Sequence, residues 1–507
     1  EWVYPNSNNN NQPRYQHKEP TLGIVDKTYR IKIEFPFRLF SNCGQDSILR
    51  PVLGKNGIPF IPGSSIKGIF RRTCTPEQAV KYCGDNKKLV PGILRFHRAY
   101  PIGDWAATKQ VPIRQNGQII SKTSYRIVDV IHPQQKRQVE GGGSPKALAS
   151  ISFYQPTCIF ELSSSNTDIN WKEVEKILLN ALQNGVGGKT STGYGLGAHI
   201  PSQSPTIPKY PLNINFKGFG VSPLLRNNEP EFRPNVFKAT LRGHVKRLLG
   251  GVCNNKKALE KTVNKFFGSS EAPGIVNIFW EVREENYNYN QNDMTPTYDT
   301  KGILHINAPT IDIRFIEQVL KFGFIMGGFG KSWRRVSHKK FYPRYPKLAQ
   351  GLHIGCHWEC LDSSWINIST TNDLKQFLND LYELCKNRLG TQPPSAMNWR
   401  EAWHPNRVVV YSKVVSKSQA VELFHDDTFK NTPAIGGKNQ GDKRPKFFSS
   451  VWHRMLPISH NQYLEIVTVF HGDLTPWQHR LEGNQLQQFI NILEKKGLQL
   501  SWGEKPR

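Results

Sequence analysis

The sequence predicts an α+β protein in which one order of elements, strand-helix-strand-strand-helix-strand, occurs twice. Three observations support this prediction. A turn and a basic helix follow the first predicted strand, a glycine-rich loop follows the second predicted helix, and the same succession returns later in the chain. The chain is therefore interpreted as a tail (1–20), a first unit (21–203), a second unit (204–350) and a C-terminal α+β part (351–507) that completes or decorates the second unit.

The composition indicates a polyanionic partner. Of 507 residues, 67 are Lys or Arg and 40 are Asp or Glu, so the formal net charge is +27. A basic surplus of this size, spread along the whole chain, favours nucleic acid as the partner. No apolar run reaches the length that spans a bilayer, so no membrane partner is expected.

The N-terminal and cysteine patterns favour a cytoplasmic protein. Residues 1–20 are polar and rich in Asn, which predicts a disordered tail and not a signal peptide. Eight scattered cysteines without a Cys-x-x-Cys pair are typical of reduced thiols. Zinc-ligand types occur together at Cys74, Cys83 and His97, and again at Cys356, His357 and Cys360. Neither group has zinc-finger spacing, so buried structural cysteines are favoured over zinc.

Alternating apolar and charged residues, together with apolar residues at helical spacing, define the elements of the first unit. They are strands at 29–40, 93–100, 149–162 and 194–200 and helices at 63–73 and 171–184. Residues 101–147 differ in kind, because they are rich in Lys, Arg and Gln and end in a Gly-Gly-Gly stop. Such a long excursion from a compact domain predicts either disorder or a functional arm.

The helix that begins at Gly63 is the first predicted anion site. Ser64 or Ser65 can cap it, while Lys67 and Arg71, with Arg72, lie close to the cap. The free N–H groups of a helix N-terminus attract anions, and the basic side chains add to that attraction. We therefore expect this helix to bind phosphate groups.

The glycine-rich loop at 185–197 is the second predicted anion site. Glycines, among them Gly187 and Gly188, let backbone N–H groups approach phosphates closely, and Lys189, Thr190 and Ser191 add charge and hydroxyl donors. The loop is not a Walker P-loop, because it lacks that spacing and follows a helix instead of opening one.

The second unit repeats these features beyond a Pro/Ser-rich joint at 201–211. It has a strand from Asn213, a basic helix at 232–249, a strand at 276–282, a Tyr/Asn-rich excursion at 284–300 and a helix at 313–324. A second glycine loop follows this helix. Its expected phosphate contacts are Lys238 and Arg242 on the helix and Lys331 and Arg334 in the loop. The element order in both units is that of the ferredoxin-like fold, which also underlies RNA-recognition modules.

Residues 61–71, Ile-Pro-Gly-Ser-Ser-Ile-Lys-Gly-Ile-Phe-Arg, and the loop at 185–197 resemble the hallmark motifs of the RAMP superfamily. The resemblance is to the backbone subunits of type III CRISPR–Cas effector complexes. It covers residues 22–200 with good specificity and 212–345 with less, because the second unit lacks the Pro-Gly-Ser-Ser form. It implies two ferredoxin-like RAMP modules in tandem, as in III-D variants, with thumb-like insertions at 101–147 and 284–302. The implied partners are CRISPR RNA, target RNA and other subunits of the complex.

The resemblance also implies a nuclease residue. Backbone subunits of this kind often cut target RNA with an aspartate between the first strand and the Pro-Gly-Ser-Ser helix, and Asp46 is the only acidic residue there. Its carboxylate can accept a proton from a 2′-hydroxyl or hold a divalent ion such as Mg²⁺. Arg50 lies in the same loop, and such a cation can stabilise charge on phosphorus. The equivalent loop of the second unit offers Glu229 and Glu231 alone, so that half is expected not to cut.

Three hypotheses remain open from the sequence. The chain is a backbone subunit with one target-RNA nuclease site, a scaffold that binds RNA and cuts nothing, or a CRISPR-RNA-processing endonuclease. The third class usually uses a histidine, for which His132 and His244 are candidates. The Pro-Gly-Ser-Ser motif favours the backbone classes.

Overall fold

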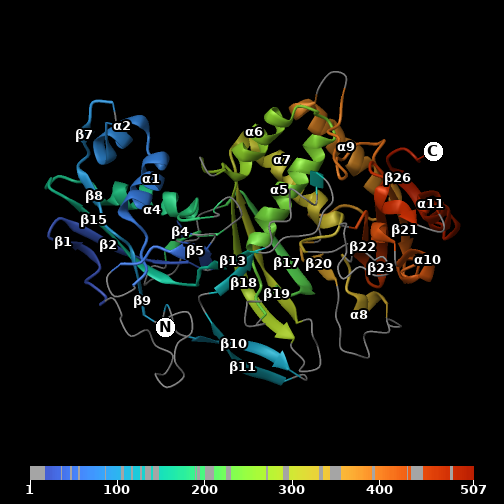
Figure 1. The fold of residues 1–507 in the computed structure, drawn as a ribbon, viewed down its shortest axis with the longest axis horizontal. Coiled ribbons are helices and arrows are strands. Elements are labelled where there is room, and N and C mark those ends of the chain that lie inside the picture. Colours follow the sequence, from blue (N-terminus) through green and yellow to red (C-terminus); the bar gives the residue numbers. More distant parts are fainter. Residues whose placement is uncertain are drawn as a thin grey trace.

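The computed structural model arranges the chain around three main sheets with their helices, which lie from left to right in Figure 1 in sequence order. No helix among the residues described has both the length and the apolar character needed to cross a membrane. The residues described are 18–35, 37–40, 42–45, 48–54, 58–85, 87–103, 105, 108–115, 118–125, 128–131, 139–140, 148–188, 190, 194–199, 210–223, 230–269, 272–288, 296–330, 335–342, 355–362, 364–390, 394–430, 432–435, 449–479 and 483–506.

The first unit is an antiparallel sheet covered on one face by two helices (Figure 1). Strand β2 pairs with β15 on one side and with β1 and β16 on the other, while β8 and β9 pair with the far side of β15. Side chains alternate along β2, with Ile31 and Ile33 buried under the helices and Arg30 on the open face. The elements are β1 (Gly23–Val25), β2 (Thr28–Glu34), α1 (Gly63–Thr73), β8 (Leu94–Phe96), β9 (Tyr100–Ile102), β15 (Thr157–Ser164), α4 (Trp171–Gln183) and β16 (Ala198–His199).

The second unit repeats the same strand order in its own antiparallel sheet, β18-β19-β17-β20. Its elements are β17 (Leu212–Val221), α5 (Asn235–Gly250), α6 (Lys256–Phe267), β18 (Asn277–Asn288), β19 (Thr297–Asn307), α7 (Thr310–Ile325) and β20 (Cys356–Cys360). The excursion expected at 284–302 is largely part of this sheet, because residues 284–288 of β18 pair with 297–301 of β19. The tip between these strands lies outside the described residues except for Pro296.

The C-terminal part contains a third sheet with the order β22-β23-β21-β26. The sequence predicts that residues 351–507 complete or decorate the second unit. Strand β20 closes the second sheet, while residues 408–502 form a sheet of their own, which we call the third unit. Its elements are β21 (Val408–Val415), α10 (Asp427–Lys430), β22 (Val451–Ser459), β23 (Gln462–Phe470), α11 (Leu486–Lys495) and β26 (Gln499–Trp502), and α9 (Thr371–Leu389) precedes it.

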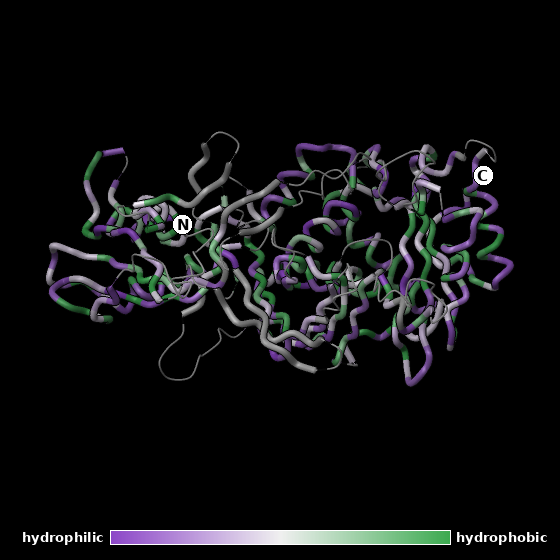
Figure 2. The backbone as a smooth tube through the Cα atoms, turned by 60° about the horizontal axis from the view of Figure 1, so that its bottom comes forward, coloured by the Kyte–Doolittle hydropathy of each residue, from purple (hydrophilic) through white to green (hydrophobic). Residues whose placement is uncertain are grey.

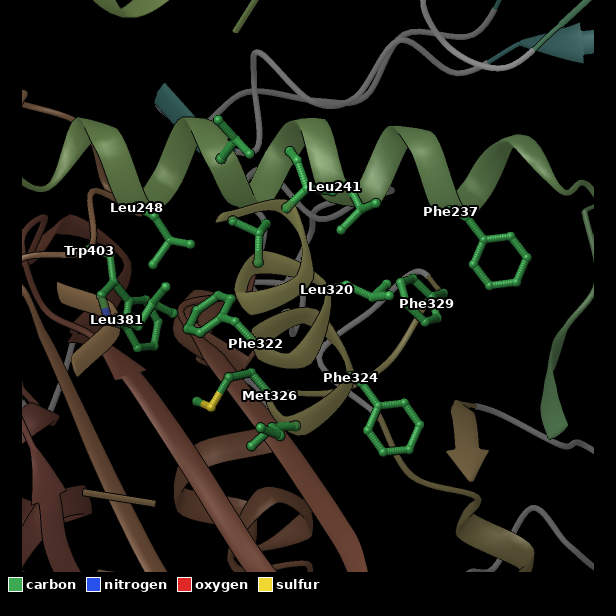
Figure 3. Close-up of a cluster of buried hydrophobic side chains, with 14 of the residues drawn as sticks. Phe237, Leu241, Leu248, Leu320, Phe322, Phe324, Met326, Phe329, Leu381 and Trp403 are labelled. Atoms are coloured by element: carbon green, nitrogen blue, oxygen red, sulfur yellow. The ribbon is translucent and has the colours of Figure 1, made fainter. Parts of the chain in front are cut away.

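The second and third units share one hydrophobic core. Figure 3 shows Leu248 of α5 near Phe322 of α7, Leu381 of α9 and Trp403, with Leu241 of α5 and Leu320 of α7 further along the same core. The same core includes one face of β21 and β23, whose other face packs on α11, so both faces of this sheet are covered. Figure 2 shows the resulting concentration of hydrophobic residues in the strands near the C-terminus. Burial on both faces gives near-continuous apolar strands.

The arm at 101–147 connects the first two units. Its hairpin, β10 (Thr108–Gln115) and β11 (Gln118–Tyr125), joins the edge of the second sheet, where Arg114 of β10 pairs in parallel with Asn288 of β18. Further along, Val139 is buried in the core of the second unit, and Glu140 forms an ion pair with Lys246 of α5. The arm is thus anchored to the second unit at two places among the described residues.

Short elements complete the description. A small sheet, β12-β13-β5-β4, joins the base of the arm to the hairpin that follows the first strand. The remaining elements are β3 (Arg38–Leu39), β4 (Asn42–Gln45), β5 (Ile48–Pro51), α2 (Pro76–Gln78), a π-turn (Ala79–Cys83), β6 (Gly84–Asp85), β7 (Val90–Pro91), β12 (Val128–Ile131), β13 (Leu148–Ile151), β14 (Phe153–Tyr154), α8 (His338–Phe341), β24 (Gln478–His479), β25 (Gly483–Asn484) and three 3₁₀ turns (Leu423–His425, Pro433–Ile435, Thr475–Trp477).

Candidate nucleic-acid interface

Helix α1 presents a polar, basic face to solvent. Its apolar residues Ile66, Ile69 and Phe70 are buried in the first core, as the sequence spacing predicts. Ser64, Ser65, Lys67 and Arg72 are exposed. Pro62 occupies the N-cap and offers no side-chain acceptor, and no acidic residue lies in the first turn. The N–H of Ser65 donates to Pro62 O at 3.0 Å, whereas no side chain at the N-cap accepts from the N–H groups of the first turn, so this turn can still receive an external anion.

Arg71 has a different role from its neighbours on α1. Its guanidinium donates to the carbonyl oxygen of Gly84 at 2.7 Å, so it ties the helix to strand β6. The contact is made by one guanidinium nitrogen, Nη1, and the Arg71 side chain is half-buried. The RNA contact of Arg71 stays a prediction, while the structure shows that Arg71 supports the helix through Gly84.

An open groove of about 530 Å³ lies beside the N-terminus of α1. Gly63 contacts the edge of the sheet so closely that a Cβ would overlap the carbonyl oxygen of Phe96. Arg98 lies over the ring of Phe60 at 4.6 Å, an arrangement that holds the guanidinium beside the groove. The lining residues are Pro20, Gly63, Ser64, Phe96, His97, Arg98, Tyr100, Ile159 and Glu161.

Gly68 on α1 faces open space. No atom of the described residues, apart from its chain neighbours and the helix backbone, lies within 4 Å of where its Cβ would be. A glycine inside a helix costs about 0.5–1 kcal/mol relative to alanine. Since no contact among the described residues requires Gly68, the surface of α1 is open at this position.

The glycine loop, residues 185–197, is fixed by main-chain hydrogen bonds to the segment after β2. The N–H of Gly188 donates to Phe40 O at 2.7 Å, and that of Gly195 donates to Arg38 O at 2.9 Å. Gly187 has φ +82° and abuts Phe40 so closely that a Cβ would overlap its carbonyl oxygen. Tyr194 packs on the ring of Phe40 at 4.9 Å. Gly187 and Gly195, which has φ +68° and would place a Cβ against Val186 O, are therefore required by internal packing, and the prediction of phosphate binding did not include this role.

The sheet brings this loop, the arm and the segment that carries Asp46 to one end of the first unit. In the paired register, Ala198 lies beside Glu34, Glu34 beside Thr157, and Thr157 beside Ile102. Ala198 and Thr157 start their strands, and Glu34 and Ile102 end theirs. The segments that adjoin these four residues therefore meet the sheet at the same end. The α1 N-terminus lies elsewhere, at the sheet edge, where Ile61 pairs with Ala99.

Several predicted residues fall outside the described part of the chain. They are Asp46, Lys189, Ser191, Lys331, Arg334 and His132. Asp46 lies between β4 and β5, which form a hairpin in which Gln45 of β4 pairs with Ile48 of β5. Arg50 lies in β5, and the structure describes its backbone alone.

The second-unit helix α5 does not present the basic face that its sequence suggests. Lys238 is buried and donates to the carbonyl oxygen of Thr190 in the glycine loop at 3.2 Å. Desolvation, with the nearby charge of Arg242, lowers the pKa of Lys238 to about 8. Arg242 itself donates to Gly268 O at 2.8 Å and to the Asn264 side chain at 2.7 Å. Both predicted RNA contacts are thus engaged inside the protein.

The second glycine loop is also packed against its own unit. A Cβ on Gly328, which has φ +66°, would lie 2.7 Å from the Trp358 ring, and Gly327 abuts the side chain of Arg335. Arg335 is buried and stacks on Trp452 of the third unit at 3.9 Å. This loop therefore helps to join the second and third units.

The cysteine groups do not form a metal site among the described residues, where no cluster of three or more His, Cys, Asp or Glu could hold an ion. Cys74 and Cys83 are close enough for their thiols to hydrogen-bond, which lowers the pKa of Cys83. His97 instead hydrogen-bonds Ser163 Oγ at 2.7 Å. His244, a candidate base, is buried beside Phe322 and Trp452.

Sequence reasoning missed a buried ion pair between the first two units. Arg38 Nε donates to Glu231 Oε1 at 2.8 Å, and the two side chains are almost inaccessible to solvent. From the sequence, Glu231 is predicted only to be a carboxylate in the loop before α5. No local signal could have paired residues so far apart in the sequence.

Comparison with known proteins gives partial likenesses to solved structures. No family model and no curated protein matches the chain. Cmr1 from Pyrococcus furiosus, in its apo form, has a TM-score of 0.38 and 14% identity, over 57% of this chain and 98% of that one. Cmr6 from the same organism has a TM-score of 0.22 and 18% identity, over 35% of this chain and 100% of that one. A chain of the type III-B Cmr-beta complex bound to cognate target RNA has a TM-score of 0.27 and 20% identity, over 34% of this chain. The match spans 58% of that chain's length.

Proposed function

We propose that this chain is an RNA-binding subunit of a type III CRISPR RNA-guided effector complex, of the RAMP superfamily. The observation that carries the proposal is the exposed N-terminal half of α1, where Ser64, Ser65 and Lys67 face solvent next to the groove with Arg98. Helix N-terminal N–H groups, hydroxyls and cationic side chains are the groups that bind phosphate oxygens. The net charge of +27 supports a polyanionic partner for the chain as a whole.

In this proposal the first and second units are tandem backbone-like modules. The common strand order of their sheets supports one architecture for both, and the motif at 61–71 assigns the guide-binding role to the first. The partners are CRISPR RNA, target RNA and other subunits of the complex. The third unit, whose sheet is covered on both faces, takes no direct part in RNA binding.

Salt-dependent RNA binding tests this proposal. Phosphate contacts release counterions, so the affinity for single-stranded RNA should fall steeply with salt and depend little on base sequence. Lys67→Ala combined with Lys189→Ala should weaken binding to every sequence and reduce the salt slope. A shallow slope, or strong preference for a short base motif, contradicts the proposal.

We further propose that Asp46 cleaves target RNA paired to the guide. Its carboxylate accepts the proton of a 2′-hydroxyl, whose oxygen attacks the adjacent phosphorus and expels the 5′-oxygen of the next nucleotide, which takes up a proton from water. The products are a 2′,3′-cyclic phosphate and a 5′-hydroxyl. Mg²⁺ commonly binds through one or two carboxylates with waters and substrate phosphates, so a single aspartate suits that ion.

Cleavage is tested in an assembled complex with matched target RNA, which is compared between wild type and Asp46→Ala. The variant should lose one cut and keep guide binding, and matched DNA should survive because it lacks the 2′-hydroxyl. If every cut survives with the variant fully incorporated, the chain is a scaffold. Cleavage of free CRISPR precursor RNA would instead indicate a processing endonuclease.

A further inference from the structure

We propose that the second unit positions the glycine loop of the first unit, so that the RNA-facing loop of one unit is completed by the other. This inference rests on the proposed RNA-binding function. Two contacts from the second unit carry it, one from Lys238 directly to Thr190 and one from Glu231 through Arg38. Lys238 and Glu231 are then positioning residues and do not touch RNA.

The contact through Arg38 leads directly to the loop. The Arg38 guanidinium is fully buried, with a second nitrogen 2.6 Å from Glu231 Oε1 and a hydrogen bond to Ser152 Oγ at 2.8 Å. The main chain of the same residue accepts from Gly195 N–H at 2.9 Å. Fixing the Arg38 side chain therefore fixes the carbonyl group that holds the glycine loop.

Glu231 is itself firmly held in the second unit. Its main-chain N–H donates to Ser222 Oγ at 2.9 Å, directly after β17, which fixes the main chain at Glu231. Its second carboxylate oxygen accepts from Arg233 Nε at 2.8 Å. A buried carboxylate shared by two arginines gives a specific geometry, and loss of one partner of such a pair is strongly destabilising.

Lys238 is placed for internal contact and not for phosphate. Its side chain is 5% exposed, and its ammonium group reaches the Thr190 carbonyl oxygen at 3.2 Å. A lysine is almost never buried without a partner, because desolvation of the charge is costly. The desolvation cost of burying this ammonium group is partly offset by its hydrogen bond to Thr190, one of the residues expected to face RNA.

The test compares Lys238→Met with Lys257→Met and Lys67→Ala in the full chain, by titration of a fluorescein-labelled single-stranded RNA of mixed sequence. Lys257 is an exposed lysine on α6, so its variant removes the same charge from the second unit. We expect Lys238→Met to weaken binding about tenfold more than Lys257→Met, because the loop is misplaced. Its slope of log affinity against log salt should stay as in wild type, since no phosphate contact is lost, whereas Lys67→Ala should reduce that slope by about 0.7.

Hydrogen exchange on the same variants provides the second readout. Lys238→Met should speed exchange in residues 37–40 and 185–197 and leave the third unit unchanged. A slope reduced as in Lys67→Ala would mean that Lys238 contacts phosphate and would overturn the inference. Binding equal to that of Lys257→Met would overturn it as well. If wild type binds RNA without salt dependence, the proposed function fails, while the exchange result still decides whether Lys238 holds the loop.

Discussion

Glycines in the first unit fall into two kinds, which differ in the atoms that surround them. Gly187 is needed by the fold, because it has a positive φ and touches the Phe40 carbonyl. Gly68 is not needed by any contact among the described residues, and it lies on the exposed face of α1 next to Lys67. The first belongs to the scaffold of the loop, and the second belongs to the surface that we assign to RNA.

Gly68→Ala should raise stability and lower RNA affinity. Alanine in a helix interior is favoured over glycine by about 0.5–1 kcal/mol, and the free energy of unfolding should rise by that amount. A methyl group on this face would obstruct a phosphate backbone that approaches the helix. The control is Asn379→Ala, an exposed position on α9, which should add helix propensity without any change in RNA affinity. Unchanged RNA binding by Gly68→Ala would remove this face of α1 from the interface.

Lys238 makes stability depend on pH with a definite sign. Burial lowers its pKa from 10.5 to about 8, so between these values the unfolded chain binds a proton that the folded chain does not. The free energy of unfolding contributed by this group therefore rises with pH across that window, by at most about 1.4 kcal/mol per pH unit. Urea denaturation from pH 7 to 10 should show wild type gaining stability relative to Lys238→Met. A constant difference would mean that the ammonium group is not desolvated.

At the scale of elements, the patterns that are local in sequence were predictable and the contacts between units were not. The alternation in β2 and the apolar spacing of α1 and α4 gave the first unit, since those side chains face one core. The sequence interpretation placed the basic residues of α5 in solvent. That placement is wrong for Lys238, because a loop almost fifty residues earlier in the chain covers it. The periodicity of a helix does not indicate such a tertiary contact.

The glycine loop offers the sharpest test at this scale. Gly187→Ala forces a positive φ and a clash with Phe40 O, whereas Gly23→Ala, at φ +85°, meets nothing within 4 Å among the described residues. Both variants should lose about 1–2 kcal/mol from the backbone conformation, and Gly187→Ala should lose about 2 kcal/mol more from the clash. Chemical denaturation of the two variants measures the difference. Equal losses would show that the loop does not pack tightly on β3.

At the scale of the whole molecule, the three units differ in what their sheets leave accessible. The first sheet has an open face with a groove at its edge, while the third sheet is enclosed between the shared core and α11. The C-terminal part was predicted to be α+β, but that its strands form a separate third sheet was not, because apolar strands indicate burial without indicating which layers cover them. In the proposed function, α1 of the first unit is the helix that binds RNA, and the second and third units support the first unit.

RNA–protein crosslinking tests this account most directly. Wild-type protein is bound to a photoreactive single-stranded RNA at moderate salt, and the crosslinked peptides are mapped by mass spectrometry. The account predicts that crosslinks concentrate in residues 58–73 and 185–197, and that competitor RNA removes them. Crosslinks concentrated in residues 408–502, or spread evenly over the lysines of all three units, would contradict the claim that the first unit binds the RNA.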